Sequence, residues 1–286
     1  MAVRYLIAYL AVLALPGCGI DLEKPKARHT NKQAEANPEQ PQGKVEAAPA
    51  PEPENPIHPK LLFHGGGGMS TSAMIDMTSA AAVLKKLGVP AEHIYVIKYP
   101  HTKNIKDINA AVDTQLKTIF AKYPANTRFD SIGHSLGLLA SFISLSELGH
   151  LPKIRSIIGV TGVLMRQDVK ALPMGCTKGS TTDLCGDIFD KVVGTANSPY
   201  ILDLLSKNAT ELKRINKCSI WTSQDGILSP PNAGVFPDGK SVEMPKSWCA
   251  STAGIFGNLN PCHLTAKSAT PVYEAMKTQC FGGDFK

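Results

Sequence analysis

Hydrophobic and polar positions follow two different periods along residues 60–286. Short apolar runs, such as Lys60–Phe63 and Ile94–Ile97, are typical of buried strands. Asn104 is a predicted helix N-cap, and Pro124 ends the helical pattern that follows it. The apolar face of that helix is predicted to hold Ile105, Ile108, Val112, Leu116, Ile119, Phe120 and Tyr123. Alternating strands and helices predict a mostly parallel sheet with helices on both faces.

Further segments extend this alternation. Residues 72–87 are predicted to form a helix that Gly88 closes. Arg128–Ile132 has the alternation of a strand, and the helical spacing after it runs to Gly149. A buried strand is expected at Ile154–Val160. The total is about six strands, and the region from residue 60 onward is of a size that suits one domain.

Gly133–Gly137, which reads G-H-S-L-G, lies between the third predicted strand and the helix after it. A sharp strand-to-helix turn would expose the hydroxyl of Ser135, and the two glycines would remove side chains that clash at the turn. The N-terminus of the helix would also stabilise developing negative charge. The pattern therefore indicates a nucleophilic serine, with an ordinary glycine-rich surface turn as the alternative.

A nucleophilic serine needs two backbone N–H donors for the oxyanion that forms during acyl transfer. The residue after the nucleophile, Leu136, is expected to supply one. Four glycines follow His64 at the end of the first strand, and Gly66 is the predicted second donor, with Gly67 as the alternative. No Lys-Ser or Lys-Thr follows, which argues against a phosphate-binding loop. A loop without chemical importance is the other reading.

The hydroxyl also needs a base, and after such a turn the acid and then the histidine come later in the chain. Only His150 and His263 follow Ser135, and His150 lies at the far end of the helix that leaves the serine. His263 is therefore the predicted base. Asp225 is the favoured acid because it ends an apolar run at a strand's carboxyl edge, whereas Asp238 lies in a Pro-Asp-Gly turn. The other aspartates with the right order are Asp168, Asp183, Asp187, Asp190 and Asp203.

Over about 60–280, these motifs resemble secreted bacterial lipases and esterases of the α/β-hydrolase fold, in particular the class 2 lipases. The matches are His64–Gly66 to the oxyanion loop, Gly133–Gly137 to the nucleophile turn, Thr222–Ile227 to the acid-bearing turn and Cys262–Leu264 to the terminal histidine loop. The resemblance implies hydrolysis of acylglycerols or smaller esters through an acyl-enzyme, with no cofactor. Alternatives are thioester or polyester cleavage on the same fold, or an inactive hydrolase fold kept as a surface binding module.

The chain has seven cysteines, and all except Cys18 lie between residues 176 and 280. An even number in an exported domain suggests disulfides, although spacing alone does not fix their pairing. The segment that contains Cys176 and Cys185 resembles the cysteine-bridged insertion of larger family members, which implies a bond between these two. We then expect Cys249–Cys262, which would brace the loop of His263, and Cys218–Cys280. No C-x-x-C occurs, so the spacing argues against a zinc site.

Residues 1–18 are predicted to be an export signal. Arg4 supplies the basic region, Tyr5–Leu15 is an apolar core too short to span a bilayer, and Leu15–Cys18 resembles a bacterial lipobox. We expect Cys18 to be acylated and to attach an exported lipoprotein to the outer membrane. Ordinary secretion or release to the cell surface, with cleavage nearby, is the alternative.

Residues 19–59 contain eight of the 21 prolines and almost no large apolar side chains, which predicts a disordered tether. The catalytic domain is then expected at 60–286, with a cap over the site at 163–216 or plain packing of that segment as the alternative. The net charge of +6 comes without a basic cluster that has interleaved aromatic residues, which argues against nucleic acid as a partner. We expect a monomer.

Overall fold

The computed structural model describes residues 58–65, 77–100, 104–164, 198–225, 228, 231–249 and 261–285. All of them belong to one unit, Ala48–Lys286. The predicted export signal with Cys18, most of the tether, Gly66, Gly67, Cys176 and Cys185 lie outside the described residues. The domain boundaries and the cap remain predictions.

The described residues contain a six-stranded sheet in which every neighbouring pair of strands is parallel, in the order β2-β1-β3-β4-β5-β6. This arrangement confirms the predicted parallel sheet. Its strands are β1 (Lys60–Phe63), β2 (Ile94–Ile97), β3 (Phe129–His134), β4 (Ile154–Val160), β5 (Asn216–Trp221) and β6 (Lys240–Glu243). The sequence gives little signal for β6, because this edge strand has one apolar residue, Val242, and is mostly exposed.

The α-helices are α1 (Thr78–Lys86), α2 (Ile105–Phe120), α3 (Leu136–Glu147), α5 (Pro199–Lys207), α6 (Ala209–Arg214), α7 (Pro261–Thr265) and α8 (Thr270–Ala275). Helix α2 begins as predicted, because the side chain of Asn104 accepts a hydrogen bond from the backbone N–H of Lys106. Short 3-10 turns lie at Ala91–His93, Leu151–Lys153, Lys246–Trp248 and Ala266–Ser268, and a π-helical turn, η5, at Met276–Cys280. Among the described residues, no helix is both long enough and apolar enough to cross a bilayer.

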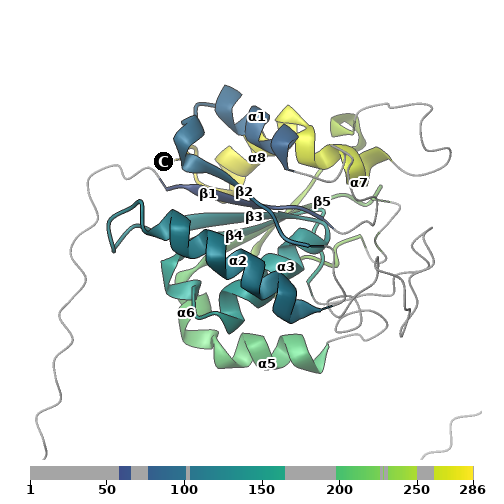
Figure 1. The fold of residues 1–286 in the computed structure, drawn as a ribbon. Coiled ribbons are helices and arrows are strands. Elements are labelled where there is room, and N and C mark those ends of the chain that lie inside the picture. The colour runs from purple at the N-terminus through teal and green to yellow at the C-terminus, as the bar shows by residue number, and fades with distance from the viewer. Residues whose placement is uncertain are drawn as a thin grey trace, which may run out of the picture. The chain divides into compact units, whose positions relative to one another are not determined.

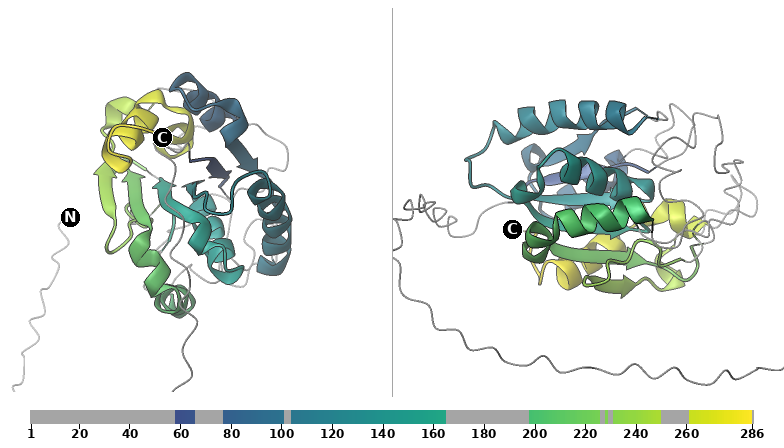
Figure 2. Two further views of the ribbon diagram at one scale, coloured as in Figure 1. Left: turned by 90° about the vertical axis from the view of Figure 1, so that its left-hand side faces the viewer. Right: turned by 90° about the horizontal axis from the view of Figure 1, so that it is seen from below.

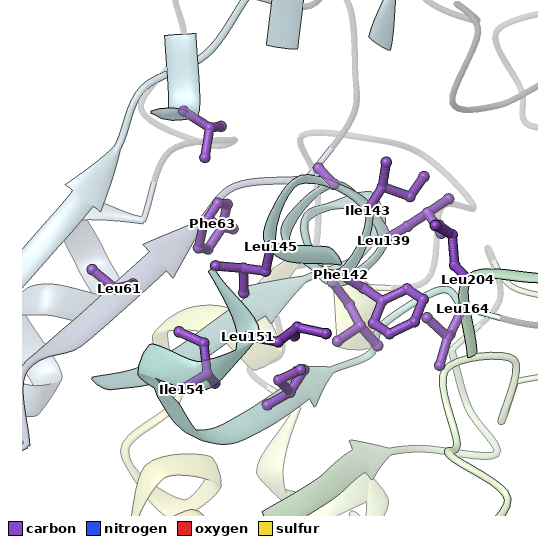
Figure 3. Packing of buried hydrophobic residues seen from close by; sticks show 14 of the residues in the cluster. Leu61, Phe63, Leu139, Phe142, Ile143, Leu145, Leu151, Ile154, Leu164 and Leu204 are labelled. Atoms are coloured by element: carbon purple, nitrogen blue, oxygen red, sulfur yellow. The ribbon is translucent and has the colours of Figure 1, made fainter. Parts of the chain in front are cut away.

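Helices cover both faces of the sheet, and each face has its own apolar core (Figures 1 and 2). One core joins the sheet to α2, α3 and α5, and Figure 3 shows Phe142 of α3 packed near Leu164 and Leu204. The other core joins the opposite face to α1 and α8 and contains Ile132 of β3. The residues on β3 therefore alternate between two buried layers, which is typical of a central parallel strand.

A buried ion cluster lies where β1 and β3 begin, at the opposite end of these strands from the serine. The Lys60 ammonium lies 2.6 Å from a carboxylate oxygen of Asp130 and 2.5 Å from the carbonyl oxygen of Phe285, and Arg155 also pairs with Asp130. Burial disfavours the charged carboxylate, but Lys60 and Arg155 outweigh this effect and hold the pKa of Asp130 below its usual value. The cluster fastens residues near 285 to the first strand of the sheet.

Two of the three expected disulfides fall on residues that the structure describes, and both are present. Cys249–Cys262 joins the segment after β6 to α7, and Cys218–Cys280 joins β5 to η5. The first bond lies directly beside His263 in the sequence, whereas the second fastens the last helical turns to the sheet.

Candidate active site

The candidate site lies at the carboxyl ends of the central strands. From β1 the chain goes to β2 on one side and then to β3 on the other, so the order of the strands reverses between β1 and β3. In open α/β sheets such a switch point leaves a crevice, because the connections leave in opposite directions. His64 and Gly65 follow β1 there, and Ser135 follows β3.

Ser135 has an unusual backbone conformation for a residue with a side chain, with φ 53° and ψ −129°. Its N–H donates to the carbonyl of Val160, and its own carbonyl accepts from the N–H of Val163. These bonds fix a strained conformation of a kind that is often found at functional sites. A side chain at Gly133 or Gly137 would collide with nearby backbone, so the turn requires both glycines.

His263 lies between Ser135 and Asp225. Its Nε2 is 2.9 Å from Oγ of Ser135, and its Nδ1 is 2.8 Å from the nearer carboxylate oxygen of Asp225. A neutral imidazole that donates from Nδ1 to the carboxylate presents a lone pair on Nε2 to the serine hydroxyl. The three side chains thus form one continuous hydrogen-bonded relay, which suits proton removal from the serine.

The acid of the relay is held by its own turn. Asp225 is fully buried and follows β5, and Oδ1 of its carboxylate accepts a hydrogen bond of 2.7 Å from the N–H of Leu228. The turn is closed by the N–H of Asp225, which donates to the carbonyl of Thr222. These bonds orient the carboxylate toward the imidazole of His263.

The alternative candidates have other partners. Asp238 is largely exposed and pairs with Lys217, whose ammonium lies 2.9 Å from its carboxylate. His150, at the far end of α3, lies 2.9 Å from a carboxylate oxygen of Asp113 on α2. Asp203 forms an exposed ion pair with Lys207 within α5. None of these three reaches the relay.

The predicted oxyanion site lies only partly within the described residues. Leu136 is the first residue of α3, and the first N–H groups of a helix have no acceptor within the helix. A Cβ placed on Gly65 would lie 2.9 Å from Cβ of Ser135, so the loop after β1 directly adjoins the serine. The predicted second donor, Gly66 or Gly67, lies outside the described residues.

Sequence reasoning missed one residue that holds the oxyanion loop. The Tyr99 hydroxyl donates to the carbonyl of His64, and the two aromatic rings stack with centroids 4.0 Å apart. Tyr99 lies two residues after the end of β2, and a polar aromatic residue near the carboxyl end of a strand is the signal that could have identified it.

Two further residues contact the backbone of the proposed base. Nε2 of His134 lies 2.8 Å from the carbonyl oxygen of His263, and the Thr161 hydroxyl lies 3.5 Å from the same atom. Thr161 follows β4 and has a positive φ of 41°. Among the described residues, no three His, Cys, Asp or Glu side chains form a group that could hold a metal ion.

No protein-family model and no curated protein sequence matches the chain. Solved structures do resemble it. A mature lipase from Bacillus licheniformis is 11% identical with a TM-score of 0.50, over 80% of this chain and 94% of the lipase. A metagenomic carboxyl esterase is 12% identical with a TM-score of 0.47, over 80% and 79% of the two chains.

The match to phospholipase PlaB from Legionella pneumophila, in complex with thio-NAD, is more partial. It is 15% identical with a TM-score of 0.43, over 59% of this chain and only 38% of the phospholipase. At such identities these likenesses concern the fold. The all-parallel sheet and the likeness to the Bacillus licheniformis lipase place the chain in the α/β-hydrolase fold.

Proposed function

We propose that the protein is a serine carboxylester hydrolase, a lipase or esterase that acts through an acyl-enzyme. The observation that carries this proposal is the relay Ser135–His263–Asp225, whose hydrogen bonds of 2.9 and 2.8 Å lie beside a strained, glycine-flanked serine turn. Such an arrangement activates a hydroxyl for attack on a carbonyl carbon.

In the first half-reaction, Nε2 of His263 accepts the hydroxyl proton as Oγ of Ser135 bonds to the ester carbonyl carbon. The carbonyl electron pair moves onto oxygen, which accepts hydrogen bonds from the N–H of Leu136 and of Gly66. The tetrahedral intermediate then collapses and its C–O bond to the alcohol breaks. His263 returns the proton to the leaving alcohol, and the acyl group stays on Ser135.

The second half-reaction follows the reverse path with water. His263 removes a proton from water, and the resulting oxygen nucleophile attacks the acyl carbon. Collapse of the second intermediate releases the carboxylic acid and restores the serine hydroxyl. Throughout, the carboxylate of Asp225 orients His263 and stabilises its cationic form.

A fluorophosphonate probe tests whether Ser135 is an activated nucleophile. The wild-type protein should be labelled, and Ser135→Ala should not be. Absence of wild-type labelling, in protein that is folded by circular dichroism, would contradict the proposal and favour a binding module.

The acyl substrate is tested separately. We propose that the protein hydrolyses p-nitrophenyl esters of at least one acyl chain length between about C2 and C16. Hydrolysis of each ester is measured with and without a lipid–water interface. Turnover of thioesters or polyesters with no ester activity would move the proposal to the alternative acyl-transfer reaction on the same fold.

We further propose that the protein is exported and attached to the outer membrane through an acylated Cys18, with residues 19–59 as the tether. The support is the lipobox-like sequence Leu15–Cys18 and the composition of the residues after it. Intact-mass measurement of the membrane fraction should show a diacyl or triacyl modification that Cys18→Ala lacks. Unmodified protein in the culture medium would favour ordinary secretion.

A further inference from the structure

His134 is a buried histidine that the proposed reaction does not use. It is the last residue of β3 and directly precedes Ser135. Its ring faces the same layer as Ile132, two residues earlier, because side chains alternate along a strand. Helix α7, from which His263 comes, lies on the same side of the sheet as α1 and α8 (Figure 1). The rings of His134 and His263 lie with their centroids 5.1 Å apart.

The contact between these two histidines fixes the tautomer of His134. Its Nε2 lies 2.8 Å from the backbone carbonyl oxygen of His263, and a carbonyl accepts only. Nε2 therefore carries the proton and donates. The Thr161 hydroxyl approaches the same carbonyl at 3.5 Å, a longer contact, so His134 is the main side-chain donor to it.

The other ring nitrogen faces the oxyanion loop. Nδ1 of His134 is buried with no hydrogen-bond partner among the described residues, and a Cβ placed on Gly65 would lie 3.2 Å from it. The imidazole is thus in contact with the loop after β1 on one side and with the backbone of His263 on the other. Both segments must keep their places for a serine between them to react.

We propose that His134 is a positioning residue, whose Nε2–H holds the His263 backbone so that the His263 imidazole stays aligned with Ser135. The proposal rests on the proposed function, because alignment matters only if His263 moves a proton. Misplacement of a catalytic group by about 1 Å can cost about 100-fold in rate, so one hydrogen bond at this point has a large effect.

The protonation state of His134 fits this role. Burial, and then repulsion by the nearby His263, lower the pKa of His134 well below its ordinary value of 6.5. His134 therefore stays neutral when His263 becomes cationic in the transition state. A neutral His134 holds the His263 backbone without repelling the positive charge that the His263 imidazole carries in the proposed transition state.

Two amide variants test the role of the donor. The amide nitrogen of Gln can take the place of Nε2, whereas the shorter Asn presents its amide at the place of Nδ1. We expect His134→Gln to keep kcat for a p-nitrophenyl ester within about threefold of wild type. His134→Asn and His134→Leu should lower kcat by about 10- to 100-fold with KM changed less than about twofold.

Thermal unfolding of each variant separates this role from a structural one. Equal kcat in wild type and a folded His134→Asn variant would overturn the proposal, and so would equal losses in the Gln and Asn variants. If His134→Leu fails to fold, the two amide variants still decide between the outcomes. Failure of the proposed function is distinct, because the wild-type protein itself would then resist the fluorophosphonate probe.

Discussion

At the scale of single residues, Asp225 and Asp238 offer a direct comparison of two candidate acids. Asp225→Asn retains the shape of the side chain but removes the charge that orients and stabilises His263. We expect kcat to fall by about 10³- to 10⁴-fold, the size of loss that serine proteases show with this change. Asp238→Asn removes an exposed carboxylate from the buried ammonium of Lys217, which still donates to the carbonyl of Leu212. Because Asp238 has no contact with His263, kcat should stay within about twofold. Ester-hydrolysis kinetics on both variants decide between the two carboxylates.

A second prediction concerns Tyr99. Burial raises the pKa of its phenol, so the hydroxyl stays protonated and donates to the carbonyl of His64. Tyr99→Phe retains the ring stack but removes the donor, which is worth about 1 kcal/mol, and we expect kcat to fall about fivefold.

The matched control for this change is Tyr95→Phe, because the Tyr95 hydroxyl bonds Tyr123 instead of the loop. Steady-state kinetics on both variants measure the difference. A loss of the same size in the control would show that the effect is not specific to the oxyanion loop.

The sequence was enough to identify the three residues of the relay, but not the residues that hold them in place. Ser135, His263 and Asp225 could be selected by chain order and by their places at strand ends. His134 was missed because the expected chain order of serine, acid and histidine directs attention only to histidines that follow the serine. Thr161 was missed because its contact is to the backbone carbonyl of a distant segment, and such a contact leaves no pattern along the chain. Tyr99 was missed although it is a polar aromatic residue near the end of a strand, because its partner, the carbonyl of His64, is also distant in the sequence.

At the scale of elements, the two disulfides allow a comparison of stability with activity. Cys218–Cys280 spans 62 positions and Cys249–Cys262 spans 13. In the loop-entropy model, removal of the first costs about 4 kcal/mol of unfolding free energy and removal of the second costs about 3 kcal/mol. Paired Cys→Ala variants, unfolded in urea, measure both values.

The loss of kcat should be larger for the variant that loses less unfolding free energy. Cys262 directly precedes His263, so loss of its bond loosens the position of the imidazole, and we expect kcat to fall at least tenfold. Folded protein without Cys218–Cys280 should retain most of its kcat, because that bond lies away from the relay. Equal kcat losses in the two variants would contradict this assignment.

Most elements could be predicted because their apolar periods are strong, and the parallel sheet followed from their alternation. Strand β6 could not, because an exposed edge strand has no buried face to leave an alternation. Helix α5 lies inside the segment 163–216, for which a cap or plain packing is expected, and its Ile201 and Leu204 belong to the core that also contains α3. Amphipathic spacing alone cannot tell which surface such a helix covers.

At the scale of the whole molecule, buried imidazoles make stability depend on pH. Burial lowers the pKa of His58 and of His134 below the ordinary value of 6.5. Between these lowered values and 6.5 the unfolded chain binds more protons than the folded one. The free energy of unfolding should therefore fall as the pH drops below about 6.5. The depressed pKa of Asp130 extends this loss into stronger acid, as its paired carboxylate becomes protonated.

Urea unfolding between about pH 8 and pH 5 measures this slope. His58→Asn places a neutral amide where Nδ1 of His58 bonds the carbonyl of Arg128, and the slope should become shallower. His93→Asn retains both buried imidazoles and should keep the wild-type slope. An unchanged slope in His58→Asn would remove His58 from this explanation.

The lysine at the start of β1 has a practical consequence for anyone who shortens the protein. Its ammonium is enclosed by the carboxylate of Asp130, the carbonyl of Phe285 and the rings of Phe281 and Phe285. Removal of the residues after Cys280 would delete the carbonyl that accepts from this ammonium and both aromatic rings that lie over it. The lysine belongs to β1, the strand that precedes the predicted oxyanion loop. A truncated version made for crystallisation would thus risk weakening the scaffold beneath the reactive end, although every residue of the relay would still be present.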